Sequence, residues 1–258
     1  MLACIYILLP LPFQRVGRVA AVVHFDAMFK QLLSGQVERL MDWVVPDVDT
    51  CRHAAAEMLV RDPAARREDL ALAIVNAAKQ RGVAVGGVTG ILSNPFSMVP
   101  ATIADVGAML KIEGTMAGTI AALLDPASLD DPAQFRADVM AVVFPAAVSQ
   151  ALRQVGIRAG ERFTKHLVRR AVGTGGLETL VKIASKVLGT RLTGKSILGH
   201  GLPLVSPGIG AGWNWLEVTA VGNRAIAYHS GQPVGAGKLR GLRDRVRKLR
   251  SGVQKRLE

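Results

Sequence analysis

The sequence predicts an all-α protein whose helices form a single domain. Apolar residues recur at three- and four-residue steps along most of the chain, which is the spacing of one face of a helix. No stretch alternates between apolar and polar residues beside hairpin turns, so no sheet is predicted. With 258 residues, of which 50% are hydrophobic and 20% charged, the chain can form one sizeable core and is not intrinsically disordered. Aromatic residues make up only 5% beside 27 Gly, so close approach between helices is expected.

The first two helices are predicted from an apolar face and a boundary signal. Residues 27–44 are expected to form a helix because their apolar residues share one face. The members of that face are Met28, Leu32, Leu33, Val37, Leu40 and Met41. An Asp-Pro pair at residues 62–63 marks the start of the second helix, which the glycines of residues 82–90 are expected to interrupt.

Prolines set the boundaries of the next two helices. Pro100 suits the first turn of a helix over 101–124, and the Asp-Pro pair at residues 125–126 ends that helix. A second Asp-Pro pair opens a helix that is expected to run over 132–160, with a kink at Pro145 because proline cannot donate a backbone hydrogen bond.

The last two predicted helices are basic and amphipathic. Residues 177–188 separate a polar face from an apolar one, and Gly189 is expected to cap the helix. Residues 238–258 carry a narrow apolar seam between Arg and Lys, after a Gly-rich linker that begins at residue 231. This helix is expected either to bind a membrane surface, a partner helix or nucleic acid, or to pack its seam back on the domain.

The predicted organisation is an apolar tail over 1–18, the helical domain over 19–230, and the linker with its basic helix over 231–258. The tail lacks the basic start and the cleavage site of a signal peptide. It is expected to be poorly ordered or docked on the domain, with entry into a membrane interface as the alternative. Two cysteines, Cys4 and Cys51, cannot form a disulfide framework, so a reducing, cytoplasmic compartment is expected.

The net charge of +12 is concentrated in two segments. Residues 1–152 carry −3, residues 153–195 carry +8, residues 196–237 are neutral, and residues 238–258 carry +7. An anionic partner is therefore expected at the two basic segments. The residues predicted to form this membrane or anion surface are Arg169, Arg170, Lys182, Lys186, Arg243, Arg247, Lys248 and Arg250.

Two long stretches contain no Asp, Glu, Lys or Arg. They are residues 82–104 and residues 196–216, and each matches the thickness of a membrane in length. Both contain Pro and several Gly, so neither is expected to cross lipid as one uninterrupted helix. They are interpreted as closely packed helical pairs in a core, with shallow membrane association as the alternative.

No complete catalytic or metal-binding motif is present. The sequence lacks GxSxG and the Walker-type GxxxxGK[ST] pattern, and its glycine strings follow no predicted strand. The histidines have no HExxH or HxH spacing, so neither a metal nor another cofactor is expected. They are His24, His53, His166, His200 and His229.

Polar residues inside the apolar stretches form the predicted polar cluster. Asp105 and Glu113 lie eight residues apart and therefore near the same face of their helix. A buried carboxylate needs hydrogen bonds or a cation, which the second stretch and its continuation supply. The cluster is interpreted as a structural polar core, with an active site as the alternative. Its members are Asp105, Glu113, Asn214, Thr219 and Arg224.

Two segments resemble motifs of the EcsC protein family. They are residues 87–125 (GVTGILSNPFSMVPATIADVGAMLKIEGTMAGTIAALLD) and residues 202–229 (LPLVSPGIGAGWNWLEVTAVGNRAIAYH). The resemblance covers about residues 60–230 and implies an all-α bacterial protein, linked through the family's namesake to an ABC-transporter operon; it implies no established reaction. Leu124 before Asp125 departs from the aromatic residue and glycine that the family often has there. The family's characteristic positions would be Asp105, Asn214, Thr219, Gly222 and Arg224.

Three functions are compatible with these patterns. The first is a non-enzymatic accessory protein that docks peripherally on an anionic membrane face or on a membrane-bound, transporter-type partner through residues 153–195 and 238–258. The alternative is a hydrolase-like enzyme centred on Asp105. The third is nucleic-acid binding through the basic tail, although few aromatic residues accompany it.

Overall fold

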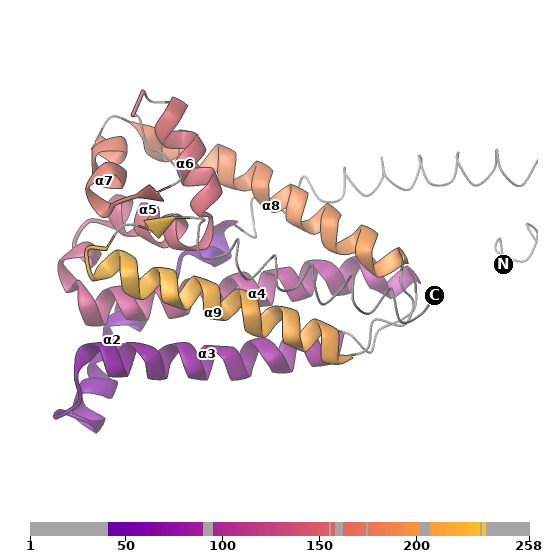
Figure 1. Ribbon diagram of the computed structural model, residues 1–258, viewed down its shortest axis with the longest axis horizontal. Helices are drawn as coiled ribbons and strands as arrows, with labels where there is room; N and C mark the ends of the chain where they lie inside the picture. The colour runs from indigo at the N-terminus through magenta and orange to yellow at the C-terminus, as the bar shows by residue number, and fades with distance from the viewer. Residues whose placement is uncertain are drawn as a thin grey trace, which may run out of the picture.

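The computed structural model describes residues 41–89, 95–154, 156–157, 162–173, 175–201, 207–232 and 234–235. Nearly all of these residues are helical, which confirms the predicted all-α class (Figure 1). The helices are α2 (Val48–Arg61), α3 (Arg67–Thr89), α4 (Pro95–Leu124), the 3₁₀ helix η2 (Pro126–Leu129), α5 (Pro132–Val143), α6 (Pro145–Gln154), α7 (Lys165–Gly173), α8 (Gly176–Gly201) and α9 (Pro207–His229). Two short strands, β1 (Arg162–Phe163) and β2 (Val234–Gly235), pair antiparallel.

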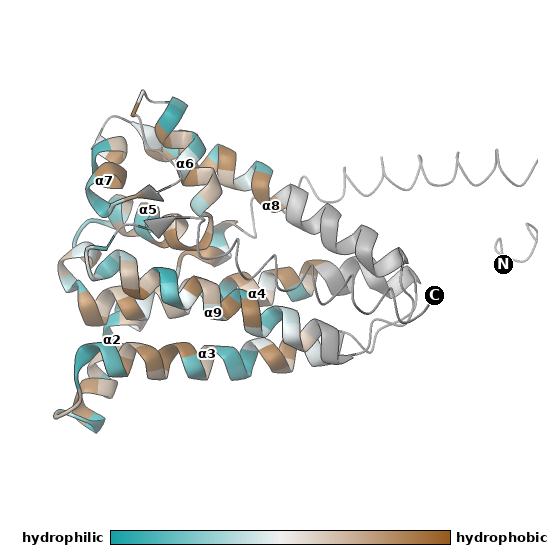
Figure 2. Ribbon diagram, viewed as in Figure 1, coloured by the Kyte–Doolittle hydropathy of each residue, from teal (hydrophilic) through white to brown (hydrophobic). Residues whose placement is uncertain are grey.

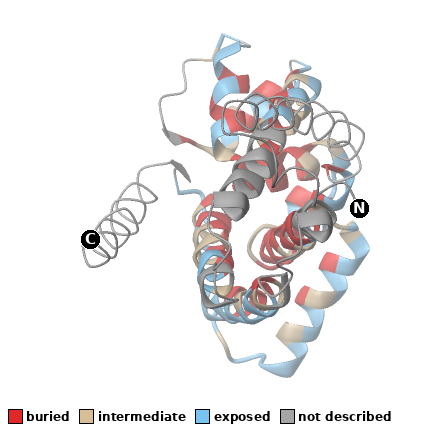
Figure 3. Ribbon diagram, turned by 90° about the vertical axis from the view of Figure 1, so that its right-hand side faces the viewer, coloured by how far each residue is buried: buried red, intermediate tan, exposed pale blue. Residues whose placement is uncertain are grey.

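The centre of the fold is a set of three long helices. Helix α9 packs against α3 and α4, and α3 also packs against α4 (Figure 1). Along α3, buried residues recur at three- and four-residue steps and form one face, and both hydrophobic and hydrophilic residues occur along the helix (Figure 2). Seen along the helices, buried residues line the sides that face one another (Figure 3). Helices α5 and α8 also pack against α4, and α6 and α7 pack against α5 and α8 to complete the core.

Glycines allow the close approach that the composition predicted. A Cβ on Gly114 of α4 would overlap the backbone oxygen of Val44. A Cβ on Gly222 of α9 would lie 2.5 Å from Cγ2 of Val75 on α3. No side chain fits at these positions without movement of the neighbouring residues, so glycine is required there by packing.

Several predicted helix boundaries were wrong, and α2 was missed. Helix α2 begins after Asp47, whose carboxylate accepts a hydrogen bond from the Thr50 N–H at 2.8 Å. Helix α3 does not break at residues 82–90 but continues to Thr89, because Gly82 packs tightly against Val218 of α9. Tertiary packing here offsets the low helix propensity of glycine.

The observed boundaries of the later helices also differ from the predicted ones. Helix α4 begins at Pro95 and not after Pro100. The helix expected over 132–160 is two helices, α5 and α6, which meet at Phe144 with a bend of 120° directly before Pro145. Helix α8 does not end at Gly189 but runs to Gly201, since a helical glycine costs only about 1 kcal/mol.

Some predictions fall on residues that the structure does not describe. These are the apolar tail over 1–18, most of the helix expected over 27–44, and the basic helix over 238–258. Arg243, Arg247, Lys248 and Arg250 therefore lie outside the described residues.

One described segment, Ile103–Leu124 of α4, is long and apolar enough to cross a membrane. Helices α5 and α6 pass the same test only if the bent pair counts as one span. In this fold, 72% of the apolar window of Ile103–Leu124 is buried inside the protein. The segment thus serves as the core helix around which the other helices pack.

Candidate functional site

The structure brings two members of the predicted polar cluster together. The Asn214 side-chain amide on α9 donates to the backbone oxygen of Gly82 at 3.2 Å and to Oδ1 of Asp105 at 3.4 Å. All of these groups are buried. Asn214 therefore joins α9 to α3 and α4 through polar contacts inside an apolar region.

The other members of the predicted polar cluster lie elsewhere. Arg224 is ten residues beyond Asn214, about 15 Å along α9, and its Nε donates to the backbone oxygen of Val142 at 2.8 Å. This bond satisfies a carbonyl in the last turn of α5. Thr219 donates to the oxygen of Trp215 in its own helix at 2.7 Å, and Glu113 is buried on α4. Asp105 and Asn214 thus contact each other, whereas Thr219 and Arg224 donate to backbone oxygens farther along α9 and on α5.

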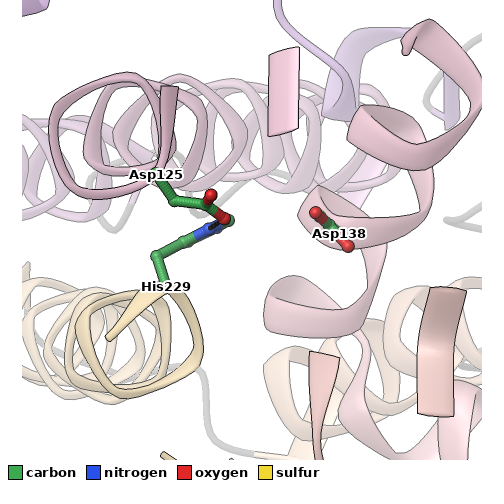
Figure 4. Close-up of side chains that lie close together, drawn as sticks. All are labelled: Asp125, Asp138 and His229. Carbon is green, nitrogen blue, oxygen red and sulfur yellow. Dashed lines mark hydrogen bonds and ion pairs between the residues drawn. The ribbon is translucent and has the colours of Figure 1, made fainter. Parts of the chain in front are cut away.

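A second polar cluster, which the sequence analysis missed, lies where α4 and α9 end. We call it the Asp138 cluster, and it combines residues from four helices or their ends. Asp125 and His229 point toward one another from the ends of α4 and α9, with Asp138 across from them on α5 (Figure 4). The members are Asp125, Asp138, Lys165, Tyr228 and His229.

Local structure fixes the positions of these side chains. Asp125 follows the last residue of α4, and its backbone oxygen accepts hydrogen bonds from both the N–H and the hydroxyl of Ser128. The strands β1 and β2 pair directly before α7 and after α9, with Phe163 opposite Val234. This pairing brings Lys165, the first residue of α7, beside the end of α9.

Asp138 is the most deeply buried carboxylate of the Asp138 cluster, with no exposed side-chain surface. Its Oδ1 accepts hydrogen bonds from the Tyr228 hydroxyl at 2.7 Å and from the Gln134 amide at 2.5 Å. Its Oδ2 has no hydrogen-bond partner and faces the Lys165 ammonium at 3.7 Å. Burial raises the pKa of Asp138 to about 7, although the two hydrogen bonds oppose this shift.

Asp125 and Lys165 form the partly exposed side of the cluster, and the buried His229 lies beside them. Oδ2 of Asp125 forms an ion pair with Lys165 and lies 3.4 Å from Nδ1 of His229. Burial lowers the pKa of His229 to about 3, so its ring is neutral near neutral pH. Burial, together with the charge of Arg169, lowers the pKa of Lys165 to about 8. The Nε2 atom of His229 is buried without a hydrogen-bond partner.

The Asp138 cluster has the donor atoms of a cation site. One carboxylate oxygen from each of Asp125 and Asp138 and one ring nitrogen of His229 lie within 4.8 Å of one another. The residues are 13 and 91 positions apart, which is no metal-binding spacing, so no sequence motif indicated them. The available signal was a carboxylate, Asp138, inside the apolar segment that forms α5.

The two stretches without charged residues meet at the other end of the protein. The final turns of α3 and the first turns of α4 carry the described residues 82–89 and 95–104, and the corresponding ends of α8 and α9 carry the described residues 196–201 and 207–216 (Figure 1). We call this region the charge-free end. Trp213, Trp215 and Val83 are exposed there by 50%, 44% and 38%. Beside them, the Lys79 ammonium lies 5.4 Å from the centre of the Trp215 ring.

The basic residues predicted to bind anions occupy a different region. Arg169 and Arg170 are exposed on α7, which lies at the opposite end from the charge-free end (Figure 1). Lys182 and Lys186 are exposed on the first half of α8. The described part of the basic surface is therefore separate from the charge-free end.

No family model, curated protein or solved structure matches this chain. The resemblance to the EcsC family rests on the motifs over residues 87–125 and 202–229 and stays a prediction.

Proposed function

We propose that this protein is an accessory protein that docks peripherally on an anionic membrane face through its charge-free end. The observation that carries the proposal is the meeting of the described parts of the two charge-free stretches at one end, where Trp213 and Trp215 are exposed. Large apolar side chains exposed together at one end of a protein favour a protein or membrane interaction site there. Vesicle binding tests whether that partner is lipid.

The residue types at the charge-free end fit a membrane interface. Tryptophan is enriched at the level of lipid headgroups because its ring is apolar and its N–H is polar. Both charge-free stretches follow directly after a basic residue, Arg81 for the first and Lys195 for the second. Basic residues next to an apolar patch suit anionic lipid, where each is worth about 1 kcal/mol.

The buried contacts of Asn214 explain why the two tryptophans point outward. Successive residues of a helix are separated by about 100° around its axis. The hydrogen bonds of Asn214 to Gly82 and Asp105 turn that residue into the protein, so Trp213 and Trp215 flank it on the two sides of α9. The docking surface is thereby held by the protein's own buried polar contacts.

The docking proposal is tested by co-sedimentation with vesicles of phosphatidylglycerol and phosphatidylcholine, beside vesicles of phosphatidylcholine alone. We expect binding to the anionic vesicles and a blue shift of tryptophan emission, since two of the three tryptophans lie in the proposed contact. Replacing both Trp213 and Trp215 by Ala should weaken binding by at least about tenfold, because burying the exposed half of each ring is worth about 1 kcal/mol.

The matched control is Trp43→Ala, because Trp43 is 55% exposed but lies outside the charge-free end. It should leave vesicle binding unchanged. Wild-type affinity in the double variant would refute docking through the charge-free end. A chain that ends at residue 235 tests the basic tail separately, since loss of binding there with retention in the double variant would assign the contact to residues 236–258.

A further inference from the structure

We propose that Asp125, Asp138 and His229 form a binding site for a divalent transition-metal cation such as Zn²⁺, at the place where the Lys165 ammonium now lies. This inference is independent of membrane docking, because the Asp138 cluster and the charge-free end lie at opposite ends of α4 and α9 (Figures 1 and 4). It concerns a site for which no sequence motif was found.

The donor set is the first argument. Two carboxylate oxygens and one imidazole nitrogen converge within 4.8 Å, each from a different helix or helix end. Mixed oxygen and nitrogen donors suit Zn²⁺, Mn²⁺ and Co²⁺, whereas Ca²⁺ and Mg²⁺ prefer oxygen alone. A cation here would link the ends of α4 and α9 to α5.

The state of Asp138 is a second, independent argument. The hydrogen bonds from Tyr228 and Gln134 both end on Oδ1, so they hold the carboxylate in one orientation. Its Oδ2 is left buried and without a hydrogen-bond partner, on the side of the Lys165 ammonium that pairs with Asp125. Hydrogen bonds that orient a ligating carboxylate are a regular feature of metal sites. A buried carboxylate oxygen without a hydrogen bond calls for a cation.

The position of Lys165 identifies where that cation would lie. Its ammonium is paired with Oδ2 of Asp125 and lies 3.7 Å from Oδ2 of Asp138. One ammonium balances only one of these two carboxylates, whereas a divalent cation balances both. The Lys165 side chain is 14% exposed at the first turn of α7, so its flexible stem gives the ammonium a route to solvent when the metal binds.

The experiment uses the untagged, full-length protein freed of metal with a chelator. Zn²⁺ is titrated by calorimetry, and Co²⁺ is titrated by visible absorption, which reports nitrogen and oxygen coordination directly. We expect about one equivalent of either metal per chain and a higher melting temperature with metal, because a ligand that binds the folded state stabilises it. Asp138→Asn and His229→Gln should each weaken binding by about tenfold or more.

Lys165→Met separates metal binding from an alternative in which Lys165 itself is the permanent cation of the cluster. If the metal replaces the ammonium, removal of Lys165 should raise metal affinity by about tenfold or more, since competition is lost. Absence of binding in both the wild type and Lys165→Met would overturn the proposal. These two proteins also decide the question if Asp138→Asn or His229→Gln does not fold.

The control for adventitious metal is His53→Ala. His53 and Glu57 form an exposed pair on α2, with Nε2 and Oε1 3.2 Å apart. This variant should bind Zn²⁺ as the wild type does. Binding that survives Asp138→Asn and His229→Gln but disappears in His53→Ala would assign the metal to the surface and refute the site.

Discussion

The two ends of α4 and α9 differ in which side chains are buried and which are exposed. Both helices begin at the charge-free end and finish at the Asp138 cluster (Figure 1). At the first end, Trp213 and Trp215 are exposed to solvent. At the other end, Asp138 and His229 are fully buried. The usual distribution of residues is therefore reversed at both ends of the same pair of helices.

The buried polar groups at one end need hydrogen bonds or a cation, and the exposed apolar groups at the other end are available to a partner. A buried carboxylate is stable only with hydrogen bonds or a cation, and the Asp138 cluster supplies both from within the chain. Exposure of the apolar rings of Trp213 and Trp215 to water is unfavourable, so their apolar area is available to a partner. Variants of the Asp138 cluster are therefore tested by their stability, and variants of the charge-free end by their binding to vesicles.

The largest effect on stability is expected from Asp138→Ala. This variant leaves the Tyr228 hydroxyl and the Gln134 amide without their buried acceptor, and it removes one of the two carboxylates beside the Lys165 ammonium. We expect the free energy of unfolding to fall by about 3–5 kcal/mol, as for other buried polar groups that lose a charged partner. Urea denaturation followed by circular dichroism measures the change.

The matched control for Asp138→Ala is Asp130→Ala. Asp130 also pairs with a cation, since its Oδ1 lies 2.8 Å from Arg52, but the Asp130 side chain is 72% exposed. Its replacement should change the free energy of unfolding by less than about 1 kcal/mol, because solvent screens surface ion pairs. Equal losses in the two variants would contradict the importance of burial at the Asp138 cluster.

Local sequence chemistry predicted the fold class and two of the sharpest boundaries. The Asp-Pro pairs at residues 125–126 and 131–132 mark the end of α4 and the start of α5, as expected. The continuation of α3 through Gly82 and of α8 past Gly189 was not predictable, because it depends on packing between distant segments. Propensity alone favoured a break at both glycines.

The candidate sites also differ in whether the sequence could predict them. Asp105 and Asn214 were grouped correctly because both are isolated polar residues in stretches of apolar and small residues. The link between Asp125, Asp138 and His229 depends on three helices ending or passing at one place, and nothing in their spacing reports that convergence. Arg224 was grouped with Asp105, yet its hydrogen bond to Val142 belongs to the other end of α9.

A smaller effect on the free energy of unfolding is expected from substitutions at two glycines, one in α4 and one in α9. Gly114 lies in contact with the Val44 backbone, whereas a Cβ on Gly212, near the charge-free end, would meet nothing within 4 Å. Gly114→Ala should lower the free energy of unfolding by about 1–3 kcal/mol through overpacking. Gly212→Ala should raise it by about 0.5–1 kcal/mol through helix propensity. Thermal and urea unfolding of both variants test this difference, and destabilisation by Gly212→Ala would show that the charge-free end is packed more tightly than described.

The smallest expected effect is the pH dependence of stability in the metal-free protein, because two opposing contributions cancel. The pKa of Asp138 is raised from 3.8 to about 7, so between these values the folded state holds a proton that the unfolded chain has released, and stability falls as pH rises. The pKa of His229 is lowered from 6.5 to about 3, so the unfolded chain binds the extra proton and stability rises with pH. Between about pH 4.5 and 6.5, the wild type should therefore show little contribution from the pair.

Single variants should reveal each contribution. In Asp138→Asn, stability should rise with pH by about 1 kcal/mol per unit, and in His229→Gln it should fall by a similar amount. The charged groups around the pair, Asp125, Asp131, Lys165 and Arg169, are common to both variants, so the difference between the two slopes isolates Asp138 and His229. Urea unfolding in the presence of a chelator measures both slopes. Slopes of the same sign would contradict a raised pKa of Asp138 together with a lowered pKa of His229, and would mean that the Asp138 cluster is as open to water as the surface around Asp130.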